Sequence, residues 1–386
     1  MLSNSRFFQK RKHICLSYLK IPTVEHNNVL KHQWDLVSGS SCRVDFPSNS
    51  FSFGTQQDQN AQAGIVYTDL EVLIKHYKNS RSSSVFLQSP YSEHYPAWFL
   101  EASDECNFAF AGYGISLSNY VDGQFRTPLI QSSKYLLASS NYDIKGYKEN
   151  LSTNSQIVLT GNPLMYEIRK SLDIQNTADR PVGLRLLWAP HWSKFWLEGR
   201  KGFARWQITL EPILEFARNH PDIEVVVRPH PILEEALISQ LKQTSKEVNR
   251  ESQVSIDVEF DSLYLLLFQS LLSLKNVSLS HSSLKEDVLN SSHLVTDGVS
   301  IIAYWATTGK PILIVNDSES PLFNEDGIRL MKEIEVASNP QEILSWLKLV
   351  AFKANNRIQN SLVDLSKSLH PTFKESPAAI FMSALE

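Results

Sequence analysis

Residues 223–231 read Ile-Glu-Val-Val-Val-Arg-Pro-His-Pro. The valine run before Arg228 predicts a short buried strand, because continuous apolar runs of this length are typical of parallel sheets. The two prolines fix the backbone on both sides of His230 and delay the helix expected from Ile232 to about Val248. A buried strand, a rigid turn and a helix are the parts of a βαβ unit, which predicts an α/β fold.

The same alternation extends outward in both directions from this unit. Strands are expected at 64–67, 84–87, 108–110, 135–138, 157–160, 184–188, 223–227, 277–279, 293–296 and 311–315, with helices such as 70–77, 205–219 and 300–308 between them. Residues 171–183 are polar and rich in turn formers, which indicates an interdomain linker. We therefore predict two Rossmann-like α/β domains with a cleft between them. The expected divisions are an irregular segment 1–60, an acceptor domain 61–170, a nucleotide-donor domain 184–340 and C-terminal helices over 341–386.

Composition sets limits on function. A chain of 386 residues fits two domains. The net charge of -4 and the pI near 6.3 argue against a general nucleic-acid binder, so the basic run 10–13 is interpreted as a solvated tail. The three cysteines show no CxxC spacing, so neither a zinc site nor a disulfide framework is expected. A reducing compartment is the expected location.

The longest apolar cluster, residues 263–274, is too short to cross a bilayer. A buried helix is the favoured interpretation, and a helix lying on a membrane surface is the alternative. The first 20 residues lack the apolar region of a signal peptide. We expect a cytoplasmic protein, with peripheral contact at the inner face of the membrane left open.

Three polar side chains follow the ends of three expected strands. These are His191, His230 and Asp297. Parallel α/β sheets bind ligands at the carboxyl edge of their strands, so the three are expected to converge on one site. Arg228 offers a planar fork of donors for phosphate. The alternative for His230 is a histidine that merely completes a turn.

The stretch Asp297-Gly298-Val299-Ser300 joins a strand to a helix. Gly298 permits close backbone approach, and the free amides of the next turn favour a phosphate. The alternative is that Asp297 or Ser300 is simply the helix N-cap. His191 is a candidate general base, because the pKa of an ordinary imidazole lies close to neutral pH.

Other residues of types that can bind a ligand or a metal are assigned structural roles. Four tryptophans lie within 188–206; core packing is favoured over an apolar wall for an acceptor or lipid carrier. The histidines other than His191 and His230 show no ligand spacing and are expected at the surface or in turns. The pair around Asp317-Ser318-Glu319 is a weak DxD motif, so no metal and no cofactor beyond a nucleotide-activated substrate is expected.

Several segments together resemble the CDP-glycerol glycerophosphotransferase family, whose members build teichoic-acid-like polymers and related surface polysaccharides. In the second half these are APHW (189–192), RPHP (228–231), LVTDGVS (294–300), TGKPILIV (308–315) and FNEDG (323–327). In the first half they are FAGYGISLS (110–118), KYLLASSNYDIKGYK (134–148) and IVLTGNP (157–163). The resemblance implies a GT-B architecture.

By resemblance, His230 contacts the donor's phosphates, and Asp297, Gly298 and Ser300 line the same pocket. Many members carry a His-Gly pair in the first domain, thought to supply the catalytic base. This chain has Tyr113-Gly114 there, so either His191 has taken that task or Tyr113 serves only to bind substrate.

The implied function is transfer of glycerol phosphate from a CDP-activated donor, with CDP-glycerol favoured, to a glycan, polyol-phosphate or lipid-linked acceptor. A GT-B glycosyltransferase using a nucleotide sugar, or a relative of nucleotide-sugar 2-epimerases, is one alternative. A catalytically silent nucleotide-binding protein is the other. No nucleic acid is expected as a partner.

Overall fold

A computed structural model describes residues 13–16, 83–87, 107–112, 114–152, 154–175, 183–193, 202–245, 262–318, 322–352, 358–370 and 374–384. The expected strand at 64–67, the expected helix at 70–77, Tyr113 and Trp196 lie outside these ranges. So does most of the segment 1–60, apart from one strand at 13–16.

The first lobe is built on a parallel sheet with the strand order β1-β2-β3-β4-β5. Its strands are β1 (His13–Leu16), β2 (Ser83–Leu87), β3 (Asn107–Phe110), β4 (Tyr135–Ala138) and β5 (Gln156–Leu159). Its helices are α4 (Val121–Phe125), α5 (Pro128–Gln131), α6 (Asn141–Asn150) and α7 (Pro163–Gln175). Helix α6 starts with a capping box, in which Ser140 and Asp143 each satisfy an orphan amide of the first turn.

The second lobe holds a parallel sheet with the order β11-β10-β9-β6-β7-β8. Its strands are β6 (Arg185–Ala189), β7 (Glu224–Val227), β8 (Val277–Leu279), β9 (His293–Thr296), β10 (Ile312–Val315) and β11 (Glu335–Ala337). The chain first winds outward from β6 and then restarts at β9 on its other side. This doubly wound order opens a crevice between the ends of β6 and β9, where such sheets bind ligands.

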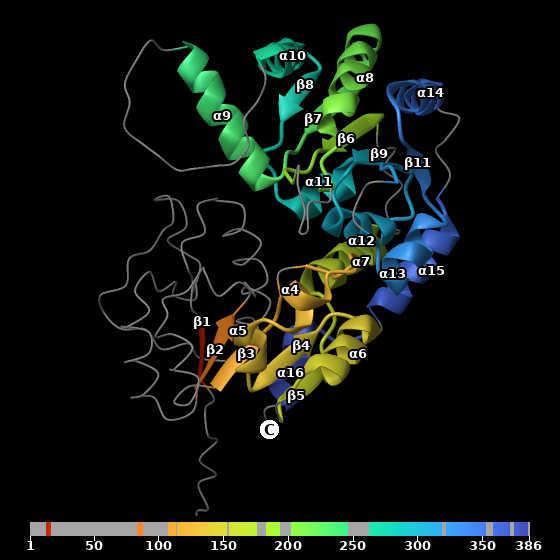
Figure 1. Cartoon of the computed structure of the whole chain (residues 1–386). Coiled ribbons are helices and arrows are strands. Elements are labelled where there is room, and N and C mark those ends of the chain that lie inside the picture. The colour runs from red at the N-terminus through yellow and green to blue at the C-terminus, as the bar shows by residue number, and fades with distance from the viewer. Residues whose placement is uncertain are drawn as a thin grey trace, which may run out of the picture.

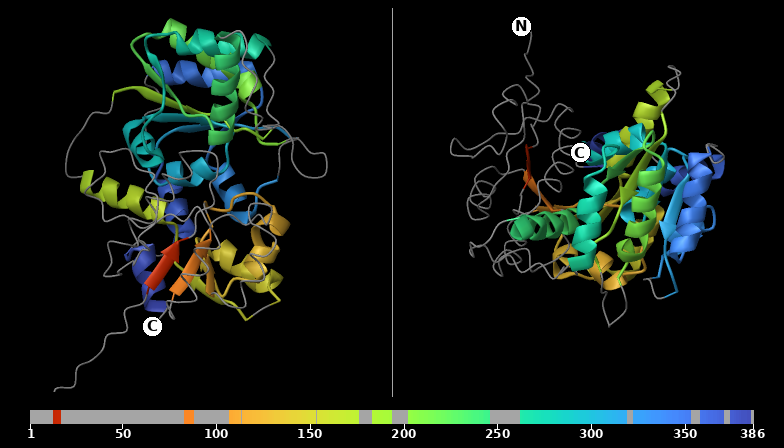
Figure 2. Two further views of the ribbon diagram at one scale, coloured as in Figure 1. Left: turned by 90° about the vertical axis from the view of Figure 1, so that its left-hand side faces the viewer. Right: turned by 90° about the horizontal axis from the view of Figure 1, so that it is seen from above.

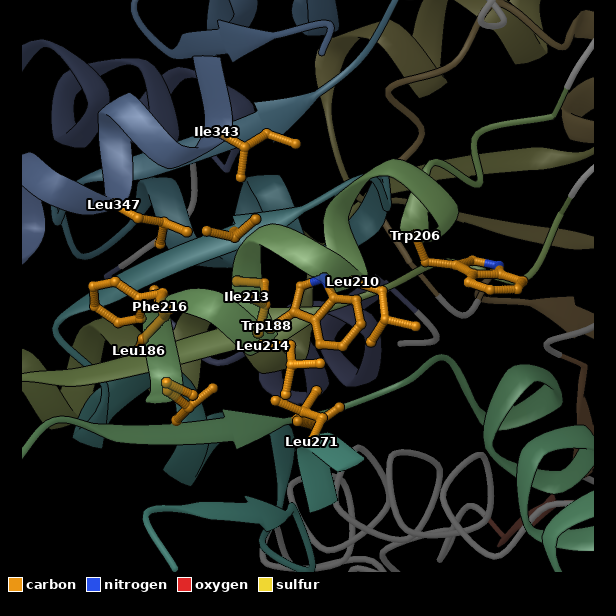
Figure 3. Close-up of a cluster of buried hydrophobic side chains, with 14 of the residues drawn as sticks. Leu186, Trp188, Trp206, Leu210, Ile213, Leu214, Phe216, Leu271, Ile343 and Leu347 are labelled. Atoms are coloured by element: carbon orange, nitrogen blue, oxygen red, sulfur yellow. The ribbon is translucent and has the colours of Figure 1, made fainter. Parts of the chain in front are cut away.

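Helices cover both faces of the second sheet (Figure 1). They are α8 (Trp206–Asn219), α9 (Pro231–Ser245), α10 (Ser262–Leu272), α11 (Leu284–Asn290), α12 (Ser300–Ala306), α13 (Glu325–Met331) and α14 (Pro340–Ala351). Successive side chains of a strand alternate between the faces. Leu186 and Trp188 therefore pack under α8 and α14, as Figure 3 shows, while Leu187 and Ala189 enter the core on the other face.

That other core joins the lobes. It holds Ile115 and Leu117 from the loop after β3, and Met165 and Ile168 from α7, together with strand and helix residues of the second lobe. All four side chains are at most 3% exposed. The two lobes therefore share one continuous apolar core on this side.

The chain end passes from the second lobe back to the first. Helix α15 (Asn360–Leu369) packs against α12 and α13, and α16 (Pro377–Ala384), near the C mark in Figures 1 and 2, lies beside β5. The ring centroids of Tyr135 and Phe381 lie 5.9 Å apart, edge to face. His370, just after α15, has its Nε2 3.0 Å from the carbonyl oxygen of Asn162. The C-terminal helices thus tie the first lobe to the second.

The structure corrects three expectations. Residues 171–175, assigned to a linker, form the end of α7. His293 and His370, expected at the surface or in turns, are fully buried. Helix α10 confirms a helix in the apolar cluster, but Leu263 and Leu266 on it are more than half exposed. Within the described ranges, no helix combines the length and apolar character needed to cross a bilayer.

Candidate active site

The three strand-end side chains converge as predicted. His191 follows β6, His230 follows β7 and Asp297 follows β9. The ring centroids of the two histidines lie 5.0 Å apart, at an interplanar angle of 62°. A Cβ built on Gly298 would lie 3.6 Å from Cδ2 of His191, so the glycine's backbone comes close to this ring. The site therefore lies at the crevice that the strand order creates.

Asp297 braces the loop that carries His191 and the start of α8. One carboxylate oxygen accepts the backbone amide of His191 at 2.6 Å, and the other accepts the amide of Arg205. The amide of His230 in turn donates to the carbonyl of Pro190 at 2.9 Å. Asp297 is only 6% exposed, so both of its oxygens are used inside the protein.

Hydrogen bonds from the backbone fix the proton position on both rings. The amide of Ser193 donates to Nδ1 of His191 at 3.2 Å, and the amide of Ile232 donates to Nδ1 of His230 at 3.3 Å. An amide can only donate, so each Nδ1 accepts, and a neutral ring carries its hydrogen on Nε2. With Nδ1 used in this way, the nitrogen left to donate to a ligand is Nε2 on each ring.

Burial strengthens this assignment for His191. Desolvation lowers the pKa of its imidazole to about 4, because a buried charge loses its hydration. His191 is consequently neutral near pH 7. Its Nδ1 also lies 2.8 Å from Oγ of Ser193, a hydroxyl that accepts the amide of Phe203 and is free to donate to the ring. The ring thus resists both rotation and protonation.

Aromatic side chains surround the imidazole pair. Trp192 lies 6.0 Å from each ring, and Phe203 lies 5.9 Å from that of His191, measured between centroids. Trp188 and Trp206 are instead buried in the core, which confirms core packing for these two of the four tryptophans. The aromatic border lowers access of water to the rings and strengthens the hydrogen bonds they make.

The start of α12 forms the other side of the site. Its N-cap is Val299, and no side chain caps the helix, so the alternative that Asp297 or Ser300 acts as N-cap is wrong. Ser300 is exposed. A Cβ built on Gly114 would lie 3.4 Å from Oγ of Ser300, which places the predicted acceptor-side glycine directly opposite this turn.

Arg228 has a partner that the sequence did not reveal. Its Nη1 donates to Asp287 at 2.6 Å, to Oγ of Ser280 at 3.1 Å and to the carbonyl of Ser282 at 2.9 Å. Asp287 is fully buried and also lies 3.7 Å from Nη2 of Arg185. Arg228 therefore compensates a buried carboxylate, and a contact with phosphate stays a prediction.

The ion pair between Arg228 and Asp287 allows a test of the structural role of Arg228. Arg228→Ala should lower the free energy of unfolding by about 3–5 kcal/mol, because it leaves a buried carboxylate without its main cation. Chemical denaturation measures the loss, and Arg126→Ala, which removes an exposed pair with Asp122, serves as the control. The double variant Arg228→Met, Asp287→Leu should recover most of the stability. A loss no larger than the control's would contradict the structural role.

A second buried arginine explains the weak acidic motif. Arg205 binds Asp317 with two parallel bonds of 2.8 Å, from Nε and Nη2. Its Nη1 donates to the carbonyls of Gly202 and Ala204. Asp317 thus holds the loop before α8 in place. Across the described ranges, no group of three or more histidine, cysteine or acidic residues is placed to hold a metal ion.

No family model and no curated protein sequence matches this chain. The fold of this chain does match solved structures. The UDP-GlcNAc 2-epimerase of Neisseria meningitidis, bound to UDP-GlcNAc, is 12% identical with a TM-score of 0.53, over 97% of this chain and 98% of that one. A putative UDP-N-acetylglucosamine 2-epimerase of Listeria monocytogenes is 8% identical with a TM-score of 0.55, over 97% and 96%. The wall teichoic acid polymerase TagF is 13% identical with a TM-score of 0.52, over 97% and 87%. The chain has the GT-B fold.

Proposed function

We propose that this chain is a GT-B transferase that binds the diphosphate of a nucleotide-activated donor against His191 and His230. The observation that carries the proposal is the pair of imidazoles at the crevice of the second sheet, whose ring centroids lie 5.0 Å apart and whose Nδ1 atoms each accept a backbone amide. Two solved structures of this fold support it, because one holds UDP-GlcNAc and another was soaked with CDPG.

Neutral donors suit the transfer of a group from a diphosphate. Negative charge grows on the leaving phosphate as its bond breaks, and preorganised N–H groups stabilise that charge without rearranging. His191 meets this requirement because Asp297 holds its backbone amide and Ser193 holds its ring before any ligand arrives. Helix α12 has only seven residues, so its dipole is a minor addition.

The proposed donor is CDP-glycerol. An acceptor hydroxyl, on a glycan or a polyol phosphate, enters beside Gly114 and attacks the phosphorus that bears glycerol. A new P–O bond forms, the bridging P–O bond of the diphosphate breaks and the nucleoside monophosphate leaves. The hydroxyl proton leaves to water or to an acceptor-side group, since Nε2 of each neutral imidazole already carries a hydrogen.

A nucleotide sugar is the second candidate, favoured by the fold likeness to two UDP-GlcNAc 2-epimerases. The same imidazoles would hold the same diphosphate. The bond that breaks is then the one between the anomeric carbon and the phosphate oxygen, and the nucleoside diphosphate leaves intact. The nature of the released nucleotide therefore separates the two reactions.

A thermal-shift panel of CDP, UDP and GDP tests the proposal. A nucleotide at 100 times its Kd should stabilise the native state by about 2.7 kcal/mol, which raises Tm. CDP should give the largest rise, and chromatography of a reaction with CDP-glycerol and acceptor should show CMP. A larger rise with UDP supports the nucleotide-sugar reaction.

Two outcomes contradict the transferase. If none of the nucleotides changes Tm, the diphosphate site is wrong. If a nucleotide binds and His230→Ala abolishes the rise, but neither CMP nor a nucleoside diphosphate is released from any donor, the chain is a silent nucleotide-binding protein. Asn339→Asp, at the exposed N-cap of α14, serves as a control that should leave binding unchanged.

A further inference from the structure

The segment Leu322–Gly327, which contains the FNEDG motif, docks on the loop that follows β3. Ser118 and Phe323 form an isolated antiparallel bridge. The amide of Asn119 donates to the carbonyl of Leu322 at 2.8 Å, and the amide of Asn324 donates to the carbonyl of Leu117 at 2.9 Å. A piece of the second lobe therefore pairs by its backbone with residues 114–119, which we call the strap.

Asn324 is the side chain at the centre of this contact. It is 4% exposed. Its Nδ2 donates to the carbonyl of Ser116 at 2.6 Å, while its Oδ1 accepts the amide of Gly327 at 2.9 Å. One amide group thus binds the strap with one end and caps α13 with the other. An ionised aspartate cannot make both bonds, because its carboxylate has no hydrogen to donate.

The approach is close enough to require a glycine. A Cβ built on Gly327 would lie 2.5 Å from the carbonyl oxygen of Leu117, well inside contact distance. An ion pair between Lys145 and Glu325 flanks the same contact. The FNEDG motif is therefore shaped to receive the strap, from its asparagine to its glycine.

The strap leads from this contact to the candidate active site. Ile115 and Leu117 are buried in the core that also holds Tyr304 and Trp305 of α12. At the strap's start, a Cβ on Gly114 would lie 3.4 Å from Oγ of Ser300 and 3.7 Å from the hydroxyl of Tyr304. The strap belongs to the first lobe by sequence, but its contacts hold it to the second.

We infer that Asn324 is a positioning residue, which fixes the strap so that the acceptor side of the cleft stays opposite the imidazole pair. The inference rests on the proposed function. Donor binding by His191 and His230 does not need the strap, whereas the approach of an acceptor beside Gly114 does. Loss of the Asn324 contact should thus reduce turnover and leave nucleotide affinity unchanged.

Asn324→Asp tests this role. The aspartate keeps an oxygen that can cap α13. It replaces the Nδ2 donor that faces the carbonyl of Ser116 with a second oxygen, so the carbonyl and the carboxylate repel each other. We expect kcat to fall by about 10- to 100-fold, as for a misplaced reacting group, with the nucleotide Kd within about twofold of wild type. The serine of Asn324→Ser can cap α13 without repelling the carbonyl of Ser116. The kcat of this variant should therefore lie between those of wild type and Asn324→Asp.

Asn339→Asp is the matched control. Its side chain caps α14 by accepting the amide of Glu342 at 3.0 Å, at an exposed position. It makes the same chemical change at a helix start that carries no strap, so turnover should stay at the wild-type level. An equal loss of turnover in both variants would overturn the positioning role and assign the effect to helix capping.

Hydrogen exchange separates failure of this inference from failure of the proposed function. The amides of Asn119 and Asn324 should exchange faster in Asn324→Asp than in wild type, whether or not any nucleotide binds. Unchanged exchange means that Asn324 does not hold the strap. Faster exchange with unchanged turnover means that the strap does not position the acceptor. Either result overturns the inference.

Discussion

Replacing His191 with alanine should lower kcat by about 10²- to 10³-fold, the cost of removing one preorganised donor from a developing negative charge. His191→Gln should keep much of the activity, because a glutamine amide can place an N–H near the position of Nε2. A glutamine cannot act as a base at neutral pH, so this pair of variants separates a donor from a base. Steady-state kinetics with a saturating donor measures the difference.

The pH profile gives an independent reading of the same residue. Burial lowers the pKa of His191 to about 4, so its ring stays neutral above about pH 5. The rate profile of His191→Ala should therefore have the same shape as that of wild type above pH 5. If the variant loses a limb near neutral pH, or if His191→Gln is as inactive as His191→Ala, His191 acts as a base and the donor assignment is wrong.

His230→Ala should reduce turnover by orders of magnitude while the fold stays intact, because His230 is partly exposed and outside both cores. The two rings lie 5.0 Å apart and serve one diphosphate in the proposal. Their effects should not add, so the double variant should be little worse than either single variant. Full activity of His230→Ala would refute its role.

Replacing Asp297 should have a large effect on stability. Asp297→Ala leaves the amides of His191 and Arg205 without their acceptor. A buried donor left unsatisfied costs about 1–3 kcal/mol, so the free energy of unfolding should fall by about 2–6 kcal/mol. Urea denaturation measures the loss, and nucleotide affinity should fall with it, because the loop of His191 loses its brace.

Asp297→Asn tests the charge of this group through the pH dependence of stability. Burial raises the pKa of Asp297 to about 7, against opposing hydrogen bonds from the amides of Arg205 and His191. Because the folded-state pKa lies above the unfolded one, protonated Asp297 contributes stability. That contribution is full below about pH 4 and is lost as the pH rises through 7. The free energy of unfolding that is lost as Asp297 ionises is about 4 kcal/mol.

The asparagine variant cannot ionise, so its stability should lack the decline that wild type shows between about pH 4 and 7. Subtracting one curve from the other removes the contributions of the other titrating groups, including His370, whose lowered pKa acts in the opposite sense. If the two curves run parallel across this range, Asp297 does not titrate within it, and its carboxylate stays charged in the folded protein.

Much of the fold could be predicted because its signals are local. The valine run of β7 and the run from Leu184 to Trp188 predict buried parallel strands, and the structure has strands there. The convergence of His191, His230 and Asp297 followed from those strands, since parallel strands end at a common edge. The family resemblance added the GT-B architecture, and the fold comparison supports it.

The rest depended on contacts between distant segments. The planar fork of Arg228 predicts a contact with phosphate, but Nη1 of that fork donates to Asp287, which lies 59 positions away in the sequence. Residues 171–175 look like a linker by composition, yet α7 continues through them because it packs against α11 and α12. His370 looks like a turn residue until α15 brings it against Asn162.

The sequence by itself determined the alternation of buried strands and helices, and with it the edge at which the two imidazoles meet. Only the tertiary structure decided which hydrogen bond each polar group makes: Nδ1 of His191 with an amide, Asp297 with two loops, Asn324 with the strap. The physical reason is that apolar periodicity acts over a few neighbouring residues, whereas a buried polar group takes the partner that folding brings within about 3 Å.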